Sequence, residues 1–134
     1  MNTERKKLAV YWMQKAKRSY ETAVRELKQK NYDFCANRLY YAAFYAVSAV
    51  LILRGQSYTK HSGVRAALHR DFVKPGIIAT EFGALYDALL RDREESDYVA
   101  FADLDPEVLK QEIIEVKKFV DKFHGILASE IDKD

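Results

Sequence analysis

The side chains that most often perform chemistry are few in this sequence. It contains three histidines, His61, His69 and His124, and a single cysteine, Cys35. One cysteine excludes an internal disulfide and a cysteine-based zinc site, and the histidines do not follow the spacing of metal ligands. We therefore expect no metal and no cofactor, with Cys35 as a buried, unreactive thiol and with His69 and His124 on helix surfaces.

The basic residues suit a different chemistry, the binding of phosphate. His61 precedes Arg65 by four residues, and it can either orient a short helix there or reach a phosphate beside Arg65. Arg38 either pairs with a carboxylate inside the fold or lines a polar cleft. Asp97 is a natural partner for Arg38, or for Arg93 one helical turn away.

Tyrosine rings are the third group of interest. The sequence has nine of them, and such rings can stack on nucleic-acid bases. At helical spacing, aromatic rings more often belong to a core. Both interpretations stay open for Tyr40, Tyr41, Tyr45, Tyr58, Tyr86 and Tyr98.

The composition fits one globular domain over residues 1–134. Hydrophobic residues make up 49% of the chain and charged residues 31%, which argues against disorder. The 5 Gly and 2 Pro are too few for the many turns of a β-sandwich or barrel. No signal peptide is visible, and the longest uncharged stretch, 39–53, is shorter than the about 20 residues of a membrane span. We therefore expect a cytoplasmic protein without a membrane partner.

The charges are distributed unevenly along the chain. Residues 1–74 carry a net charge of +10 and residues 75–134 a net charge of −8. A basic half can contact phosphate, an acidic partner or the acidic half of its own fold. These three alternatives stay open at the level of sequence.

Helical periodicity runs through the whole chain. The helix around the uncharged stretch is apolar on most sides and is expected at the centre of a bundle. The pattern predicts an all-α fold, an antiparallel bundle of four long helices and one short helix. The first expected helix carries an apolar stripe from Leu8 to Leu27. The other helices are expected over residues 34–53, 60–71, 77–95 and 106 onward, with a loop over 97–104.

Local signals mark several helix ends. Asp33 and Asp105 are expected N-caps, and Gly55 is expected to end the second helix. Pro106 suits the first helical position after Asp105. The residues expected to face inward are Leu8, Trp12, Ala16, Tyr20, Ala23 and Leu27 in the first helix, Ile78, Phe82, Leu85 and Leu89 in the fourth, and Leu109, Ile113, Val116, Val120, Phe123 and Leu127 in the last.

The block NRLYYAAFYA at residues 37–46 resembles the second-helix signature of HEPN domains, named for higher eukaryote and prokaryote nucleotide-binding proteins. Residues 12–32 resemble that family's first helix, and the segments 60–65, 72–74 and 93–98 resemble a stand-alone prokaryotic branch. The resemblance implies a helical bundle that usually dimerises, often beside a gene for a minimal nucleotidyltransferase, as a toxin–antitoxin pair.

Many members of that family are metal-independent ribonucleases with an Arg, a polar residue and a later His, and two copies of this motif meet across a dimer. Here the matching segment runs from Arg93 to Tyr98, and the histidine is absent. An imidazole titrates near pH 7, whereas a tyrosine has a pKa of about 10, so Tyr98 is a poor general base. Arg54 and His61 have a suitable spacing, but Gly55 interrupts the helix between them, and we treat the spacing as coincidental.

The leading hypothesis is a HEPN-like protein that binds nucleotide or RNA and forms a toxin–antitoxin-type pair with a nucleotidyltransferase. The alternatives are a metal-independent ribonuclease with a degenerate motif and a non-catalytic helical adaptor. We also expect a homodimer whose two-fold axis passes near the end of the fourth helix. The candidate catalytic residues are Arg93 and Tyr98, and the candidate ligand-binding residues are Arg38, Tyr41, His61, Arg65 and Asp97.

Overall fold

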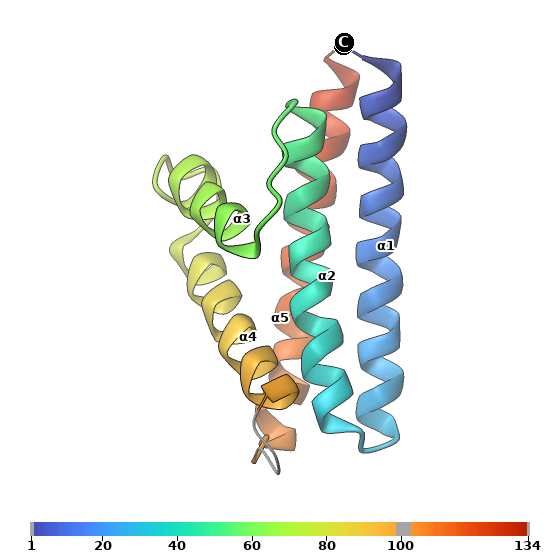
Figure 1. Ribbon diagram of the computed structural model, residues 1–134, viewed down its shortest axis with the longest axis vertical. Helices are drawn as coiled ribbons and strands as arrows, with labels where there is room; N and C mark the ends of the chain where they lie inside the picture. The colour runs from blue at the N-terminus through green and yellow to red at the C-terminus, as the bar shows by residue number, and fades with distance from the viewer. Residues whose placement is uncertain (1, 99–102, 134) are drawn as a thin grey trace.

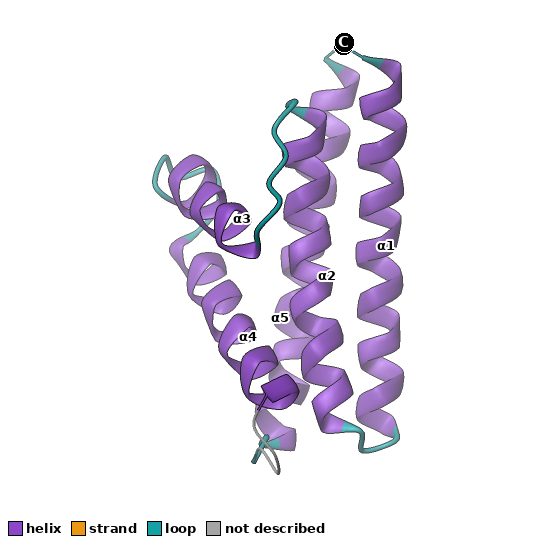
Figure 2. Cartoon of the chain, in the orientation of Figure 1, coloured by secondary structure: helices purple, strands orange, loops and turns teal. Residues whose placement is uncertain are grey.

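Helices make up nearly all of the computed structural model, which describes residues 2–98 and 103–133 (Figures 1 and 2). The described residues contain no strand, so the all-α prediction is confirmed. Four helices are long and one is short, as expected. They are α1 (Thr3–Lys28), α2 (Tyr32–Leu53), α3 (His61–Leu68), α4 (Thr80–Tyr98) and α5 (Pro106–Asp132), with a π-helical turn, η1 (His69–Val73), directly after α3.

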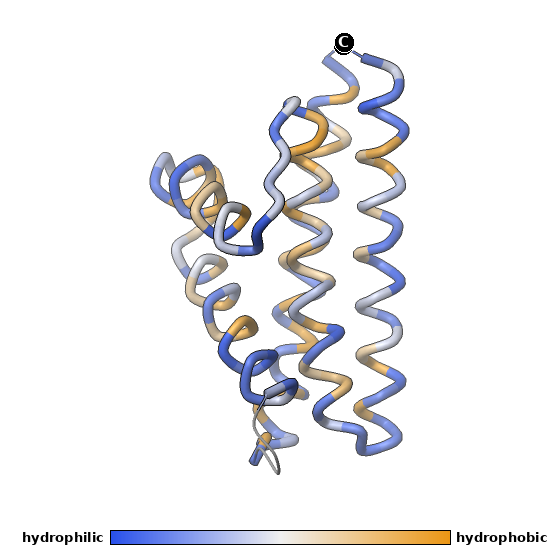
Figure 3. The backbone as a smooth tube through the Cα atoms, in the orientation of Figure 1, coloured by the Kyte–Doolittle hydropathy of each residue, from blue (hydrophilic) through white to orange (hydrophobic). Residues whose placement is uncertain are grey.

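Three helices, α1, α2 and α5, lie side by side, while α3 and α4 form an arm beside them (Figure 1). Helix α1 runs antiparallel to α2, and α1 begins at the end of the bundle where α5 finishes. Among the described residues, only α2 is long and apolar enough to cross a membrane, but 67% of its most apolar window is buried. Its hydrophobicity, visible in Figure 3, is therefore explained by its central position.

The packing of α1 against α2 depends on small side chains. The buried face of α1 consists of Ala9, Met13, Ala16, Ser19 and Ala23. The predicted stripe was offset from this face, because Leu8 is 47% exposed and Trp12 is only half-buried. Alanines allow the two backbones to approach closely, so the larger side chains lie on the flanks of the contact.

The predicted helix ends were correct in two of three cases. The Asp105 carboxylate accepts the backbone N–H of Glu107 at 2.9 Å, and Gly55 adopts a φ of 77° just after α2. The third prediction was wrong, because Asp33 lies inside the first turn of α2 and Asn31 takes the cap position. A tight connection with Lys30 at a φ of 64° starts the helix earlier than a side-chain cap at Asp33 would.

Helix α4 begins and ends three residues later than predicted, at Thr80 and Tyr98. Asp97 and Tyr98 are therefore helical and not part of a loop, whereas residues 99–102 of the expected loop lie outside the described residues. Gly83 lets α4 approach η1 closely, since a Cβ there would lie 2.9 Å from the His69 ring. The consequence for function is that one helical face presents residues 93 and 97 together.

The buried face of α5 is wider than a narrow seam. Ile113 was expected inside but is half-buried, whereas Glu112 and Phe119 are buried. Helix α5 contacts α1, α2 and α4, so it buries more than one stripe. Burial and the nearby carboxylate of Asp92 raise the pKa of Glu112 to about 8. Burial also raises the pKa of the Cys35 thiol to about 12, as expected of an unreactive cysteine.

Candidate functional site

The guanidinium of Arg93 on α4 is the centre of a polar and aromatic cluster. Its Nε donates to Asp97 Oδ2 at 3.0 Å, a bond that the spacing of four residues on a helix permits. Its Nη2 donates to the hydroxyl of Tyr41 at 3.2 Å and to that of Tyr98 at 3.4 Å. The Arg93 side chain is 16% exposed, so the cation is held at the surface in a defined position.

Three tyrosine rings surround this guanidinium. The distances from its central carbon to the ring centroids are 5.6 Å for Tyr40, 5.5 Å for Tyr41 and 5.6 Å for Tyr98. These are cation–π distances, so the guanidinium lies among the three rings. Nη1 of Arg93 has no hydrogen-bond partner among the described residues, so two of its five N–H donors remain for a ligand.

Asn37 on α2 connects a second cation to the cluster. Its Nδ2 donates to both oxygens of Asp97, at 3.2 and 3.1 Å. Its Oδ1 accepts from Nε and Nη2 of Arg38, at 2.9 and 2.7 Å. The Arg38 guanidinium also lies 5.0 Å from the centroid of Tyr41. Arg38 therefore follows neither expectation fully, because an amide, and not a carboxylate, holds it beside the cluster.

Asn37 was not predicted from the sequence to be a site residue. The available signal was its position directly before Arg38, at the start of the block that resembles a known second helix. Of the two guanidiniums, Asp97 bonds directly to that of Arg93 alone, and the cluster of Arg38, Arg93 and Asp97 carries a net charge of +1 when all three are ionised. Such a cluster favours an anionic ligand.

His61 at the start of α3 completes the cluster from the side opposite α1. Its Nδ1 lies 3.0 Å from the hydroxyl of the fully buried Tyr40, and its ring lies 4.3 Å from that of Phe44. Burial and the positive charge of Arg93 lower the pKa of His61 below its ordinary value of 6.5. The imidazole is therefore mostly neutral at pH 7, a state in which it can accept a proton.

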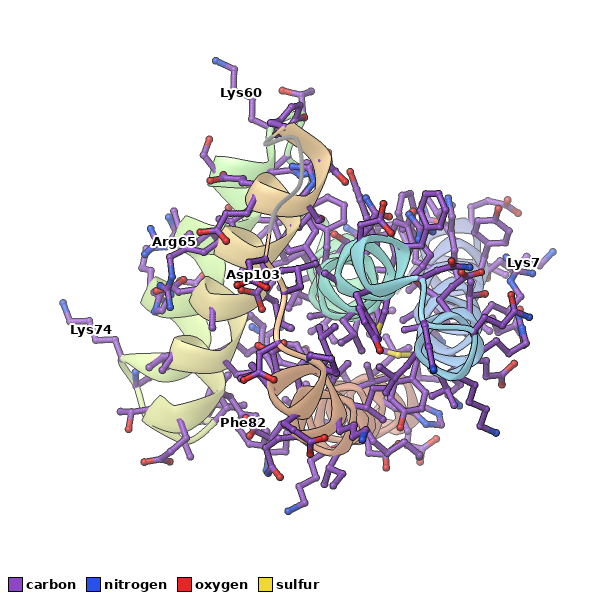
Figure 4. All side chains as sticks on the ribbon, turned by 90° about the horizontal axis from the view of Figure 1, so that it is seen from below. Lys7, Lys60, Arg65, Lys74, Phe82 and Asp103 are labelled. Carbon is purple, nitrogen blue, oxygen red and sulfur yellow. The ribbon has the colours of Figure 1, made fainter. Side chains whose placement is uncertain are left out.

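Arg65 is separate from this cluster. It forms a two-pronged ion pair with Asp87 of α4, with bonds of 2.7 and 3.0 Å. Nε2 of His69 lies 3.1 Å from the same carboxylate, so His69 is half-buried in a contact and not simply a surface residue. Figure 4 shows Arg65 on the outer side of α3, far from Lys7 of α1.

Arg54 and His61 have different hydrogen-bond partners. Its Nε donates to Glu130 of α5 at 2.8 Å, and its guanidinium lies 4.6 Å from the Phe72 ring centroid. The spacing between Arg54 and His61 therefore does not create a shared site. In the part of the chain that the structure describes, no three His, Cys, Asp or Glu side chains are grouped to hold a metal ion.

Comparison with known proteins gives a consistent family. The HEPN domain matches residues 9–129. A "UPF0332 protein" of Thermotoga maritima is 36% identical over 124 residues, which are 92% of this chain and 94% of that protein. The protein named "Putative toxin MJ0142" of Methanocaldococcus jannaschii is 30% identical over 95 residues, which are 71% of this chain and 65% of that protein.

Proposed function

Because this chain belongs to the HEPN domain family, we propose that it binds RNA or a nucleotide at the cluster of Arg38, Tyr41, His61, Arg93, Asp97 and Tyr98. The observation that carries this proposal is the state of Arg93. Its guanidinium is fixed by Asp97 and by two tyrosine hydroxyls, while its Nη1 donors have no partner among the described residues. Guanidinium groups with free donors suit the bidentate recognition of phosphate.

The aromatic rings support a nucleic-acid ligand in particular. Tyr98 is 73% exposed and lies over the guanidinium of Arg93, where a base can stack on its free face. The binding of a free phosphate would require the cations alone and not the rings. The combination of cations and exposed rings favours a ligand that offers both a phosphate and a base.

The biological setting we propose is a toxin–antitoxin-type pair in the cytoplasm, with a nucleotidyltransferase as the partner. Its support is the relative that carries the word toxin in its name and the resemblance of the block 37–46. A pull-down from the native host, with the neighbouring open reading frame intact, tests the pairing. We expect to recover a nucleotidyltransferase. A pull-down without one, together with the absence of such a gene nearby, would remove the partner from the proposal.

Ligand binding is tested by fluorescence anisotropy with a labelled single-stranded RNA hexamer at low and moderate salt. We expect binding that weakens as salt rises, and Arg93→Gln should lose at least about tenfold in affinity, since hydrogen bonds to charged groups contribute about 1.5–3 kcal/mol. Lys74→Gln removes the same charge from an exposed position and should bind as the wild type does. A wild type that does not bind at low salt would instead indicate a non-catalytic helical adaptor.

Metal-independent ribonuclease activity is a second candidate, and the position of His61 favours it. Burial and the charge of Arg93 lower the pKa of this imidazole, which favours its neutral, proton-accepting form. In this reaction the imidazole takes the proton of a ribose 2′-hydroxyl, whose oxygen attacks the adjacent phosphorus. The 5′-oxygen leaves and takes a proton from solvent water, while Arg93 stabilises the charge on the phosphoryl oxygens. The products are a 2′,3′-cyclic phosphate and a 5′-hydroxyl end.

The ribonuclease candidate is tested with single-stranded RNA in the presence of a chelator. Arg93→Ala and His61→Ala should each abolish cleavage, and the wild type should leave cyclic phosphate ends. Equal cleavage by the wild type and by both variants would identify a contaminant. Because His61, and not Tyr98, acts as the general base in this reaction, Tyr98→Phe should retain most of the activity.

A further inference from the structure

The cations on one face of α1 and α2 lie on aromatic rings and not beside carboxylates. Lys15 Nζ is 5.0 Å from the ring centroid of Trp12 and 4.7 Å from that of Tyr45. Arg38 covers Tyr41 at 5.0 Å. Neither cation forms an ion pair with any carboxylate of the described residues, whereas Arg54 and Arg65 both do.

The rings beneath these cations form a continuous row. The ring centroids of Trp12 and Tyr45 are 5.3 Å apart, and those of Tyr45 and Tyr41 are 5.5 Å apart. The hydroxyl of Tyr41 in turn accepts a hydrogen bond from Arg93. We call these three rings and the two cations that cover them the aromatic strip. It consists of Trp12, Lys15, Arg38, Tyr41 and Tyr45, and it ends at the Arg93 cluster.

The helical spacing explains why these residues share one face. On α2, Arg38, Tyr41 and Tyr45 follow one another at intervals of three and four. On α1, Trp12 and Lys15 do the same, and the bond from Ser19 Oγ to the Arg38 carbonyl at 2.8 Å fixes the register of the two helices. The strip thus extends over eight residues of α2, Arg38 to Tyr45, about 10 Å along the helix axis.

We propose that the aromatic strip is a track for single-stranded RNA that leads to the Arg93 cluster, with a base on Trp12 and phosphates at Lys15 and Arg38. This proposal rests on the function proposed above and assigns the path of the strand. The charge is complementary to a phosphodiester backbone, since the strip contains two cations and no acidic residue.

A single strand fits the strip better than a duplex. Rings can stack only on bases whose faces are free, and in a duplex those faces are covered by neighbouring base pairs. Lys15 covers the rings in the free protein, but its flexible chain can move to a phosphate and leave the indole of Trp12 open. With neighbouring nucleotides about 3.4 Å apart when stacked, the strip accommodates about three of them.

A small cavity lies at the far end of the strip. It has a volume of about 150 Å³, and Trp12 and Phe44 form part of its wall. Ser48, Gln56 and Ser57 supply it with polar side chains. A base that leaves the face of Trp12 would therefore meet hydrogen-bonding groups, so the track has a defined end.

Trp12 is the only tryptophan of the chain, and its fluorescence reports directly on the strip. The experiment titrates the full chain with the RNA dinucleotide ApA and with the hexamer A6, and it follows both tryptophan emission and the anisotropy of a labelled hexamer. We expect A6 to quench the emission in a saturable manner and to bind more tightly than ApA. The slope of log affinity against log salt should decrease by about 0.7 in Lys15→Gln, because one phosphate contact is lost.

Lys74→Gln is the matched control, since Lys74 projects into solvent from the end of η1 (Figure 4) and should leave both readouts unchanged. Hexamer binding that depends on Arg93 but leaves Trp12 emission and the Lys15→Gln salt slope unchanged would overturn the track and leave the proposed function intact. No binding of A6 by the wild type at low salt would overturn both. Trp12 emission that changes with protein concentration and not with RNA would make the strip an interface between two copies, and it would also overturn the track.

Discussion

At the scale of single residues, the candidate site depends on directed hydrogen bonds more than on charge alone. Arg93 donates to one carboxylate and two hydroxyls, and Asn37 joins Asp97 to Arg38. The rings of Tyr40 and Tyr41 lie within cation–π distance of the guanidinium. Such an arrangement places the remaining donors of Arg93 before any ligand arrives, which lowers the entropy cost of binding.

This dependence predicts that lysine cannot replace Arg93. An ammonium is a point charge and cannot donate to Asp97, Tyr41 and a phosphate in the fixed directions of a guanidinium. We expect Arg93→Lys to bind the RNA hexamer about tenfold more weakly than the wild type, which corresponds to about 1.4 kcal/mol. Anisotropy titration measures the change. Full binding by Arg93→Lys would show that charge alone is sufficient.

The neighbourhood of His61 gives a second prediction at this scale. Burial, followed by the charge of Arg93, lowers the pKa of this imidazole. NMR titration of the histidine ring nitrogens should therefore give His61 a pKa below 6.5, and Arg93→Gln should raise it by removing the second cause. A pKa of His61 above 6.5 in the wild type would contradict the burial and the proximity described here.

At the scale of helices, the sequence predicted the elements better than their exact faces. The caps at Asp105 and Gly55 were predictable because each depends on one local residue. The exposure of Leu8 and the burial of Glu112 were not, because periodicity does not reveal which neighbour a helix packs against.

In the candidate site, too, the contacts within one helix were predictable and the contacts between helices were not. The bond between Arg93 and Asp97 follows from their spacing on one helix and was anticipated. The approach of His61 to Tyr40 depends on how the loop after α2 returns the start of α3 onto that helix, and the pairing of Arg65 with Asp87 depends on how α3 lies against α4. Sequence alone does not fix these contacts, since they result from tertiary packing.

Glu112 on α5 provides a prediction at the scale of the bundle's interior. It is 6% exposed, and burial together with Asp92 raises its pKa from the ordinary 4.5 to about 8. A carboxyl whose pKa is higher in the folded state stabilises the fold fully below its unfolded pKa, and this contribution is lost as pH rises through the folded pKa. We therefore expect the free energy of unfolding to fall between about pH 4.5 and pH 8, by roughly 2–4 kcal/mol from this group.

Urea denaturation at pH 5 and pH 8 measures this effect. Glu112→Gln removes the titrating group and keeps its shape, so the variant should lose much less stability over this range and should be more stable than the wild type at pH 8. Glu21→Gln, an exposed substitution on α1, should follow the wild type. Equal pH dependence in all three proteins would mean that Glu112 is ionised in the folded state.

At the scale of the whole molecule, the charge asymmetry of the chain is only partly resolved within the fold. Arg54 pairs with Glu130 and Arg65 with Asp87, so some of the basic half contacts the acidic half. Lys15 and Arg38 form no such pair with the described carboxylates and leave positive charge beside the Arg93 cluster. Part of the remaining positive charge therefore lies on the face that we propose binds RNA.

The proposed homodimer also belongs to this scale. A two-fold axis near the end of α4 would place two copies of Arg93 close together, and the pairing of each with its own Asp97 would reduce their repulsion. Light scattering should give a mass of about twice 15.5 kDa for the wild type, and Arg93→Glu should shift the protein toward the monomer, since it places two carboxylates side by side. A wild type that stays monomeric at tens of micromolar would exclude a composite site.

The central claim is that an anionic ligand binds at Arg93, and an NMR spectrum selective for arginine Nε–Hε groups tests it most directly. Arg54 and Arg65, whose Nε groups donate to Glu130 and Asp87, serve as references within the same protein. During titration with adenosine monophosphate at low salt, we predict a saturable shift of the Arg93 signal while the Arg54 and Arg65 signals stay in place. An Arg93 signal that does not move, or shifts confined to Arg54 or Arg65, would contradict the account.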